Sequence, residues 1–354
     1  MIDSLRKIAG EIDLLLRNDP FPDRVRPEYL RDAVRDYPGR GGKRLRPALL
    51  IWCCGMLGGD PASALYPAAA AEVFHNWTLV HDDIIDQDDS RRGAPSCHVS
   101  LAGAMKRFCS EAAECERTGR DFAILAGDLQ QGWANDLLLR SAEHGVAPHV
   151  ALALARNLQK LANCELITGE ALDVEYSLRP ISELTAEEIR DMLALKTGAL
   201  LRFCAESGAM IALGTDDTEC EAVRKLGEFA VSAGIAFQLR DDYLGIFGDY
   251  TAFGKPPGAD LREGKATILL LTALRTASAP DREKLLGLIG RASYGEPELA
   301  EVRRIMRDSG AVETVDEETA RLAGRARNLL REFPDSPDRQ HLLDLVDYLI
   351  RRER

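Results

Sequence analysis

The stretch HNWTLVHDDIIDQDDSRRG, residues 75–93, places aspartates on an otherwise apolar helical pattern. The apolar residues next to the charges are Leu79, Val80, Ile84 and Ile85. On a helix, Asp82 and Asp86 share one face, and Asp89 lies close to it. Like charges stacked in this way repel one another, so a mostly buried helix tolerates them only beside a cation. The pattern predicts a helix that lines a cation site, with a solvated run of surface charge as the alternative.

Helical periodicity continues on both sides of this stretch. Apolar residues three or four positions apart begin with Ile2, Leu5, Ile8, Ile12 and Leu15. Similar patterns span residues 61–89, 121–142, 147–176, 185–213, 218–248 and 265–277. The remaining C-terminal residues predict three or four shorter, strongly charged helices, and Gly and Pro residues separate the patterns. No segment alternates as a strand does, so we expect an all-α fold with one large domain, residues 1–354.

The composition excludes several classes of protein. The 354 residues carry a formal net charge of −12, and we expect no nucleic-acid partner because general nucleic-acid binding needs a cationic surface. Hydrophobic residues make up 45% of the chain and charged residues 29%, which is typical of a globular protein. We expect no transmembrane segment and no signal peptide, hence a cytoplasmic protein. The eight cysteines form no C-x-x-C pair, so we expect most of them to be reduced and buried.

A second acidic pair, Asp241 and Asp242, follows another apolar helical pattern in the stretch FQLRDDYLGIFGD, residues 237–249. Both acidic segments are followed by cations. These are Arg91 and Arg92 after the first segment, and Lys255, Arg262 and Lys265 after the second. Oxygen ligands without a close His or Cys suit Mg²⁺, which takes few carboxylates together with water and substrate phosphate. The alternation of acid and base predicts a diphosphate held through metal ions and direct Lys and Arg contacts.

Three further elements have little meaning in isolation. In GGKRLRP, residues 41–47, the glycines allow close backbone approach, and Lys43 with Arg46 is suited to a second anion at a helix start. His75 lies two turns before Asp82 on the same helical face. The third element is Lys196-Thr197-Gly198. A solvated basic face and a structural histidine are the alternatives for the first two.

Taken together, these motifs resemble those of the trans-isoprenyl diphosphate synthases, or polyprenyl synthetases. The matching segments are GGKRLRP, HNWTLVHDDIIDQDDSRRG, ALKTG, FQLRDDYLGIFGD and GKPPGADLREGKATILL, in the order and spacing of the family over about residues 35–280. The resemblance implies the isoprenoid synthase type I fold, a single helical bundle around a deep central cavity, usually in a homodimer. It implies Mg²⁺-dependent head-to-tail condensation of isopentenyl diphosphate with an allylic diphosphate (dimethylallyl, geranyl or farnesyl).

The resemblance also implies roles for individual residues. The residues implied to hold isopentenyl diphosphate are Lys43, Arg46, His75 and Arg92. Those implied to hold the allylic diphosphate are Arg91, Lys196, Thr197, Gln238, Lys255 and Lys265, with Asp242 in support. Three Mg²⁺ ions are implied, with Asp82, Asp86 and Asp241 as ligands. The residues expected to act in catalysis are Asp82, Asp86, Asp241, Arg91, Lys196, Thr197, Gln238 and Lys255.

One position departs from the pattern of the family, which often has Asp where this chain has Gly245. The prediction therefore keeps Asp241 as the metal ligand of the second motif. Two other functions are possible for such a fold. A class I terpene cyclase shares the fold and the Mg²⁺-assisted ionisation but usually has a different second motif and lacks GGKRLRP. A non-catalytic synthase subunit tends to lose the aspartates, which are intact here.

The length of the product depends on side chains that precede Asp82, since one helical turn of about 5.4 Å is close to one isoprene unit. On a helical wheel, Thr78 lies near the aspartate face and is small, which makes Phe74 the floor of the cavity. In the family, an aromatic residue five positions before the first motif, here Trp77, commonly limits the length. This resemblance predicts geranylgeranyl diphosphate, with farnesyl diphosphate as the alternative.

Overall fold

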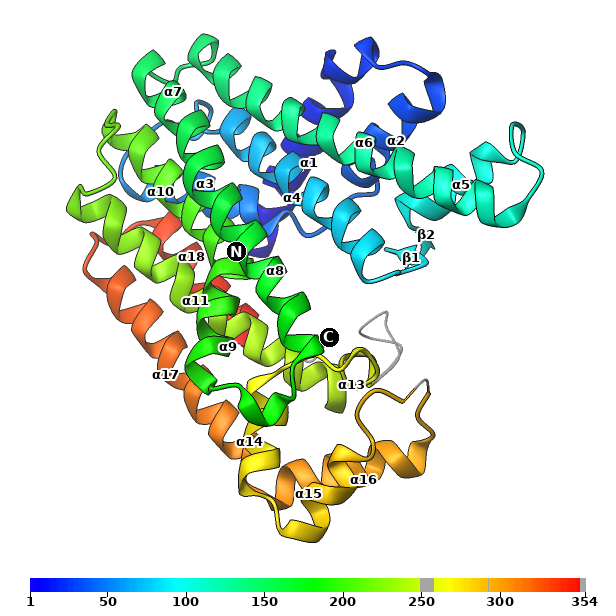
Figure 1. Ribbon diagram of the computed structural model, residues 1–354. Helices are drawn as coiled ribbons and strands as arrows, with labels where there is room; N and C mark the ends of the chain where they lie inside the picture. The colour runs from blue at the N-terminus through cyan, green and yellow to red at the C-terminus, as the bar shows by residue number, and fades with distance from the viewer. Residues whose placement is uncertain (249–257, 292, 351–354) are drawn as a thin grey trace. The chain divides into compact units, whose positions relative to one another are not determined.

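Helix α4 (Leu65–Ile85) carries the first aspartate-rich stretch and packs along helix α6 (Ala112–Arg140) (Figure 1). Pro67 stands in its first turn, where the missing backbone N–H costs no hydrogen bond. Four consecutive alanines, residues 68–71, are all buried, and their small side chains let the neighbouring helices approach closely. Burial continues to Val80, whereas Ile85 at the end of the helix is exposed, contrary to the sequence pattern.

The computed structural model describes residues 1–248, 258–291 and 293–350. Residues 1–157 and 204–223 form one compact unit, here unit 1; residues 158–203 and those from 224 onward form the other, unit 2. The single domain expected over residues 1–354 stays a prediction. Helices make up most of the described structure, and the strands described there are only two residues long, which confirms the all-α prediction. None of the described helices is both long and apolar enough to cross a membrane.

Unit 1 packs helices from the N-terminal half of the chain around α4. Its other helices are α1 (Ile2–Asn18), α2 (Glu28–Gly39), α3 (Leu45–Met56), α5 (Cys97–Met105), α6, α7 (Pro148–Asn157) and the second part of α10 (Ala199–Leu213). It also contains two short 3-10 turns, Phe21–Arg24 and Ser141–Glu143, and the paired two-residue strands β1 (Ser90–Arg91) and β2 (Ala94–Pro95). Helix α1 buries Ile8 and Ile12 as its pattern predicts, but it buries Leu16 rather than Leu15, and Ile2 is exposed. The apolar stripe is therefore displaced by one residue at its C-terminal end.

Unit 2 contains the remaining helices and a second hydrophobic core. Its elements are α8 (Cys164–Leu178), α9 (Ala186–Leu193), a π-helical turn Ala194–Gly198, the first part of α10, α11 (Glu221–Phe247, of which residues 224–247 belong to this unit), α13 (Ala259–Glu263), α14 (Ile268–Thr276), α15 (Ala279–Leu286), α16 (Glu296–Asp308), α17 (Ala311–Arg331) and α18 (Pro337–Ile350). A capping box between Thr185 and Glu188 starts α9.

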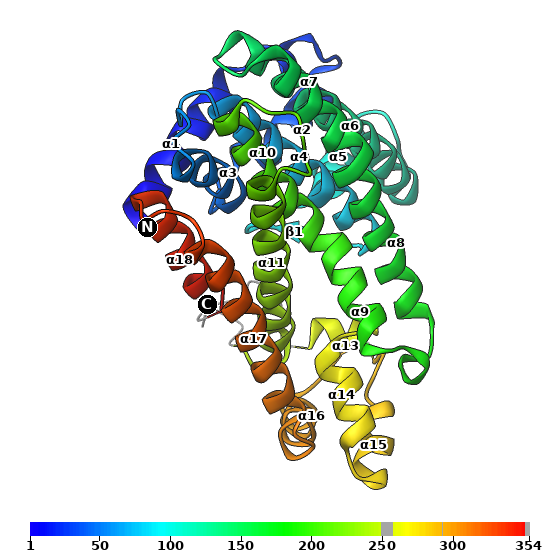
Figure 2. The ribbon, with the colours of Figure 1, turned by 90° about the vertical axis from the view of Figure 1, so that its left-hand side faces the viewer.

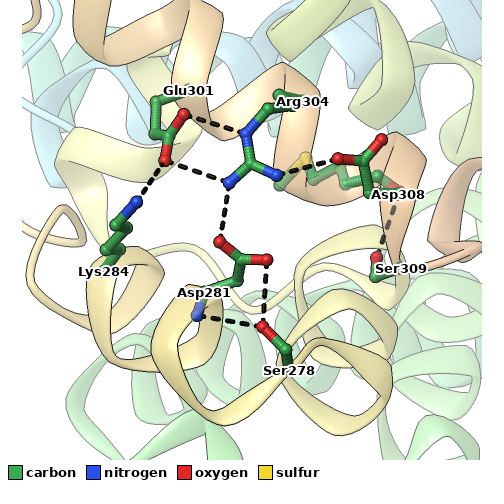
Figure 3. A network of polar contacts seen from close by, with 8 residues as sticks. Ser278, Asp281, Lys284, Glu301, Arg304, Asp308 and Ser309 are labelled. Atoms are coloured by element: carbon green, nitrogen blue, oxygen red, sulfur yellow. Dashed lines mark hydrogen bonds and ion pairs between the residues drawn. The ribbon is translucent and has the colours of Figure 1, made fainter.

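Helices α11 and α17 run antiparallel within unit 2 (Figure 2). Ion pairs join Lys225 to Glu332, Glu228 to Arg325, and Arg240 to Asp316. In a second polar network, Arg304 of α16 contacts Asp281 of α15 at 2.6 Å and Glu301 at 3.0 Å (Figure 3). Because the exposed members of such networks are well solvated, the apolar core rather than these pairs provides most of the stability.

The cysteines differ in part from the expectation. Six keep reduced thiols, and four of these, Cys53, Cys54, Cys97 and Cys204, are buried. Cys164 is exposed. Cys109 and Cys115, on either side of the turn between α5 and α6, form a disulfide that the absence of C-x-x-C spacing did not predict. A separation of six residues brings their Cα atoms to 5.7 Å because the chain reverses direction between them.

Candidate active site

Three aspartates at the end of α4, Asp82, Asp83 and Asp86, differ in their exposure to solvent. The backbone N–H of Asp86, which caps the helix, donates to the carbonyl oxygen of Asp82 at 2.8 Å, so these two residues remain one turn apart. The side chain of Asp82 is partly exposed and that of Asp86 is exposed. Asp83, to which the sequence assigns no role, is the fully buried member. The predicted metal ligands are therefore accessible, and the buried charge is a different one.

Asp83 contacts Arg91, which lies on β1. The Nε and Nη2 atoms of Arg91 both donate to Oδ1 of Asp83, with the Nε bond at 2.8 Å. Tyr37 of α2 donates its hydroxyl to Oδ2 of the same carboxylate. A further bond of Arg91, from Nη2 to Oδ2 of Asp88, measures 3.3 Å. Arg40, the residue that follows α2, donates from Nη1 to the carbonyl oxygen of Arg91 at 3.0 Å. Side chains at the end of α2 therefore contact both the backbone of Arg91 and the carboxylate that Arg91 binds.

Three of the four residues predicted to hold isopentenyl diphosphate influence one another electrostatically. Burial, and then the positive charges of Arg46 and Arg92, lower the pKa of His75 well below its usual value. Burial also lowers the pKa of Arg46, whose Nε atom is buried without a hydrogen-bond partner. Arg92 donates to the carbonyl oxygen of Gly41. A neutral histidine among these cations, beside an unsatisfied Nε, is suited to an anion. The fourth residue, Lys43, is exposed on the same segment.

The three residues considered for product length lie together on α4. Phe74, Trp77 and Thr78 are all buried. The rings of Phe74 and Trp77 are 4.7 Å apart between centroids and tilted by 54°. The hydroxyl of Thr78 donates to the carbonyl oxygen of His75 at 2.8 Å, which turns its polar atom toward the helix itself. Phe74 and Trp77 are therefore one aromatic pair rather than two separate candidates.

In unit 2, the π-helical turn Ala194–Gly198 carries Lys196 against α8. Its Nζ atom lies 2.6 Å from Oε2 of Glu170 and 2.6 Å from Oδ2 of Asp173. Gly169 makes this approach possible, because a Cβ atom there would stand 2.2 Å from the backbone nitrogen of Lys196. Two carboxylates with little solvent access share one ammonium, so this group of three retains a negative charge.

Four more predicted residues of unit 2 form a chain of contacts. Thr197 donates to Oε1 of Gln238 at 3.3 Å, and Nε2 of Gln238 donates to Oδ1 of Asp242 at 3.0 Å. Lys265 lies 3.7 Å from the same oxygen of Asp242. Burial raises the pKa of Asp242 to about 6, although the charge of Lys265 opposes the shift. Burial lowers the pKa of Lys265, but the carboxylates of Asp260, Asp242 and Asp173 together raise it above its usual value.

Gly245 and Asp260 occupy neighbouring positions on α11 and α13. A Cβ atom on Gly245 would stand 2.7 Å from Oδ2 of Asp260. The carboxylate of Asp260 thus approaches the place that a side chain at position 245 would take, and it contributes to the field on Lys265. Asp241 is partly exposed on the same helix. Lys255, predicted to hold the allylic diphosphate, lies outside the described residues.

Gly245→Asp should lower stability rather than improve the site. The new carboxylate would meet that of Asp260, and steric crowding of this kind costs about 1–3 kcal/mol even without the added charge repulsion. Urea unfolding measures the loss. Gly245→Ala is the control, since the mobile end of the Asp260 side chain can give way to a methyl group. Equal stability of Gly245→Asp and the unchanged protein would contradict the expectation.

The carboxylates of the first motif fit Mg²⁺ in chemistry. Asp82 and Asp86 offer only oxygen atoms, at a helix end that is open to solvent. Nowhere in the described part of the chain do three or more His, Cys, Asp or Glu side chains gather as a complete metal centre. Such an incomplete set is what Mg²⁺ commonly uses, because water and substrate phosphate supply its other ligands.

Five residues that the sequence assigned no role take part in these groups. They are Tyr37, Asp83, Glu170, Asp173 and Asp260. Asp83 was visible as part of the first motif. Glu170 and Asp173 carry a weak signal, because they lie three residues apart and thus share a helical face. Asp260 was likewise visible, within the matching segment GKPPGADLREGKATILL, although no role was assigned to it. Tyr37 carries no signal that can be read without the fold.

The chain is similar to known proteins in both sequence and structure. Residues 27–306 match the family model described as Polyprenyl synthetase. The short chain isoprenyl diphosphate synthase of Methanothermobacter thermautotrophicus is 32% identical over 353 residues, covering 100% of this chain and 99% of that protein. The geranylgeranyl pyrophosphate synthetase structure from Pyrococcus horikoshii Ot3 has a TM-score of 0.83 at 31% identity, covering 99% of this chain and 98% of its own. A geranylgeranyl pyrophosphate synthase from Corynebacterium glutamicum, complexed with isoprenyl diphosphate and magnesium, has a TM-score of 0.84 at 28% identity over 99% of each chain.

Proposed function

The chain belongs to the polyprenyl synthetase family, and from this premise we propose that it is a Mg²⁺-dependent short-chain isoprenyl diphosphate synthase. Enzymes of this family are prenyltransferases. The proposed reaction joins isopentenyl diphosphate head to tail with dimethylallyl, geranyl or farnesyl diphosphate. The family match carries the proposal. The unsatisfied Nε of Arg46 beside His75 and Arg92 supports it, because these groups are suited to bind a diphosphate.

The chemistry accounts for the residue types. The allylic C–O bond ionises, the double bond of isopentenyl diphosphate attacks the resulting cation, and an oxygen of the departed diphosphate is proposed to accept the proton that is then lost. When bound, Mg²⁺ neutralises the charge that develops on the departing diphosphate. Considered for each unit separately, Arg91 in unit 1 and Lys196 in unit 2 are proposed as cations that bind diphosphate and stabilise such a charge. Thr197 and Gln238, joined by a hydrogen bond, are proposed to orient their dipoles toward the cation.

The remaining predicted roles are proposals for the two units separately. In unit 1, Lys43, Arg46, His75 and Arg92 are proposed to hold isopentenyl diphosphate, with Asp82 and Asp86 as metal ligands. In unit 2, Lys265 and Gln238 are proposed to hold the allylic diphosphate, Asp241 is a proposed metal ligand, and Asp242 supports Lys265. Lys255 is included on the sequence alone. The number of Mg²⁺ ions is proposed to be three.

A direct assay tests the proposed function. The purified protein is incubated with Mg²⁺, radiolabelled isopentenyl diphosphate and each allylic primer in turn, and the products are separated by chromatography. A synthase incorporates label into longer diphosphates. A class I terpene cyclase would instead release diphosphate from the primer without incorporating label, and a non-catalytic subunit would do neither. Either of these two results would contradict the proposal.

We propose geranylgeranyl diphosphate as the main product, with farnesyl diphosphate as the alternative. The support is the buried aromatic pair Phe74 and Trp77 on α4, which is suited to form a floor one to two turns before Asp82. Thr78 is too small to form a floor by itself. Because the two rings are in contact, truncation of either one opens space beside the other.

Trp77→Ala should lengthen the main product by about one isoprene unit, because a helical turn of about 5.4 Å matches that length. Product chromatography is the measurement, and Phe74→Ala is assayed beside it. Longer products from Trp77→Ala would support the family resemblance, which predicts that Trp77 limits the length. Longer products from Phe74→Ala alone would support the helical-wheel prediction that Phe74 is the floor. Trp52→Ala, another buried Trp on α3, is the control and should leave the length unchanged. Unchanged products in both α4 variants would show that the floor lies elsewhere.

We further propose that the enzyme is a homodimer. Exposed apolar side chains on α6 support this, namely Ile124, Leu125 and Leu139, since apolar surface of this kind is commonly covered in oligomers. Light scattering of the purified protein distinguishes a dimer from a monomer. The cytoplasmic location stays a prediction of the sequence.

A further inference from the structure

Tyr37 is connected to both arginines that follow the first aspartate motif, to Arg91 by way of Asp83 and to Arg92 directly. Its hydroxyl donates to Asp83, which in turn accepts two bonds from the guanidinium of Arg91. Its backbone carbonyl oxygen accepts a bond of 3.3 Å from Nη1 of Arg92. Tyr37, near the end of α2, is thus linked to Arg91 only through Asp83, by its side chain, and contacts Arg92 directly through its backbone. The two connections can be separated, because only the first depends on the phenol.

The environment of the phenol fixes the direction of its hydrogen bond. Tyr37 is 1% exposed and Asp83 is fully buried. Burial, and then the hydrogen bond and charge of Asp83, raise the pKa of Tyr37 far above its usual value, so the hydroxyl keeps its proton and donates it. The same oxygen accepts the backbone N–H of Cys97 at 2.9 Å, which joins the first turn of α5 to the group.

Asp83 connects this phenol to a side chain that reaches the surface. Arg91 is 22% exposed, so its guanidinium is available to a ligand while two of its nitrogens hold Oδ1 of Asp83. A carboxylate buried without a second donor would carry an unsatisfied oxygen. Tyr37 supplies that donor at Oδ2, which fixes the plane of the carboxylate and therefore the plane of the guanidinium that binds it.

We propose that Tyr37 is a positioning residue for Arg91, whose guanidinium it orients through the buried carboxylate of Asp83. The inference rests on the proposed function, in which Arg91 binds the allylic diphosphate. Tyr37 touches no substrate in this scheme. Loss of its hydroxyl therefore affects the allylic partner and leaves isopentenyl diphosphate unaffected, because the backbone bond to Arg92 is retained.

Tyr37→Phe tests the proposal with steady-state kinetics for each substrate. We expect KM for the allylic diphosphate to rise about tenfold, the effect of an ordinary charge-assisted hydrogen bond, and KM for isopentenyl diphosphate to stay within about twofold. Calorimetry provides a readout independent of turnover. The probe is the thio-analogue of dimethylallyl diphosphate, in which sulfur replaces the bridging oxygen, and its Kd should rise by the same factor. Tyr29→Phe, on the same helix, is the matched control and should change neither constant.

A double-mutant cycle separates positioning from a general loss of structure. If Tyr37 acts through Arg91, Tyr37→Phe has no further effect on Kd of the thio-analogue in an Arg91→Gln background. The same factor in both backgrounds, an equal rise of KM for both substrates, or no change in Tyr37→Phe would overturn the proposal. Normal kinetics of Arg91→Gln alone would instead overturn the role of Arg91 in the proposed function. The two failures are therefore distinguishable.

Discussion

Asp82→Ala should lower kcat by about three to five orders of magnitude and leave the fold intact. The side chain is partly exposed at the end of α4 and stacks one turn from Asp86. Its removal takes away a repulsion between like charges, so we expect the free energy of unfolding without metal to be unchanged or slightly higher. Because Asp82 lowers stability through its repulsion with Asp86, we expect its role to be ligand binding rather than stabilisation of the fold.

Two measurements check this expectation. Single-turnover kinetics with isopentenyl diphosphate and geranyl diphosphate give the rate, and thermal unfolding gives the stability. Addition of Mg²⁺ with inorganic pyrophosphate should raise Tm of the unchanged protein more than Tm of Asp82→Ala. Asp89→Ala, an exposed aspartate in the same segment, is the control and should keep its rate within about twofold. Near-normal turnover by Asp82→Ala would contradict the assignment of this residue as a metal ligand.

Lys196→Ala should lower kcat by about two orders of magnitude, whereas Arg46→Ala should mainly raise KM for isopentenyl diphosphate. The difference follows from the reaction. Lys196 is proposed to face the diphosphate that departs, so its charge matters most as the C–O bond breaks. Arg46 is proposed to bind a diphosphate that keeps its bond throughout the reaction. Its effect is therefore equal in the ground state and the transition state.

Steady-state kinetics with each substrate varied in turn separate the two variants. Lys196→Ala also leaves Glu170 and Asp173 without their shared cation, so its Tm must be measured beside its rate. Lys160→Ala is the control for loss of a positive charge, because Lys160 is an exposed lysine on a second π-helical turn of unit 2, Leu158–Asn163. If Lys196→Ala and Arg46→Ala showed the same kinetic defect, the division between an allylic and an isopentenyl group would be wrong.

The sequence predicted the fold class and much of the candidate site, because those features depend on local spacing. A helix presents residues four apart on one face, so spacing alone was enough to place Asp82 and Asp86 together. Thr197, Gln238, Asp242 and Lys265, which contact one another in the fold, were also predicted as site residues, since each stands in a motif that resembles one family.

What the sequence could not predict depends on contacts across long separations. Tyr37 meets Asp83 only because α2 packs beside α4, and Asp260 approaches Gly245 only because α13 folds back toward α11. Local spacing also misjudged burial within the first motif, where Asp83 is buried and Asp86 is exposed. Adjacent aspartates point in directions about 100° apart on a helix, and only the packing decides which of them faces inward.

The π-helical turn Ala194–Gly198 limits which single-residue insertions and deletions the protein can tolerate. Its wider winding lets consecutive residues serve different helices, Lys196 toward α8 and Thr197 toward α11. Deletion of one codon within it would remove the extra residue of the wide turn and restore regular α-helical winding, so Lys196 and Thr197 could no longer both keep their present partners. Gly198 packs against Gly234 and Val231 in the same turn, so its neighbours would have to adjust as well. We therefore expect insertions and deletions to be tolerated in the connection of residues 214–220 but not in these five residues, where they would change which side chain faces which helix.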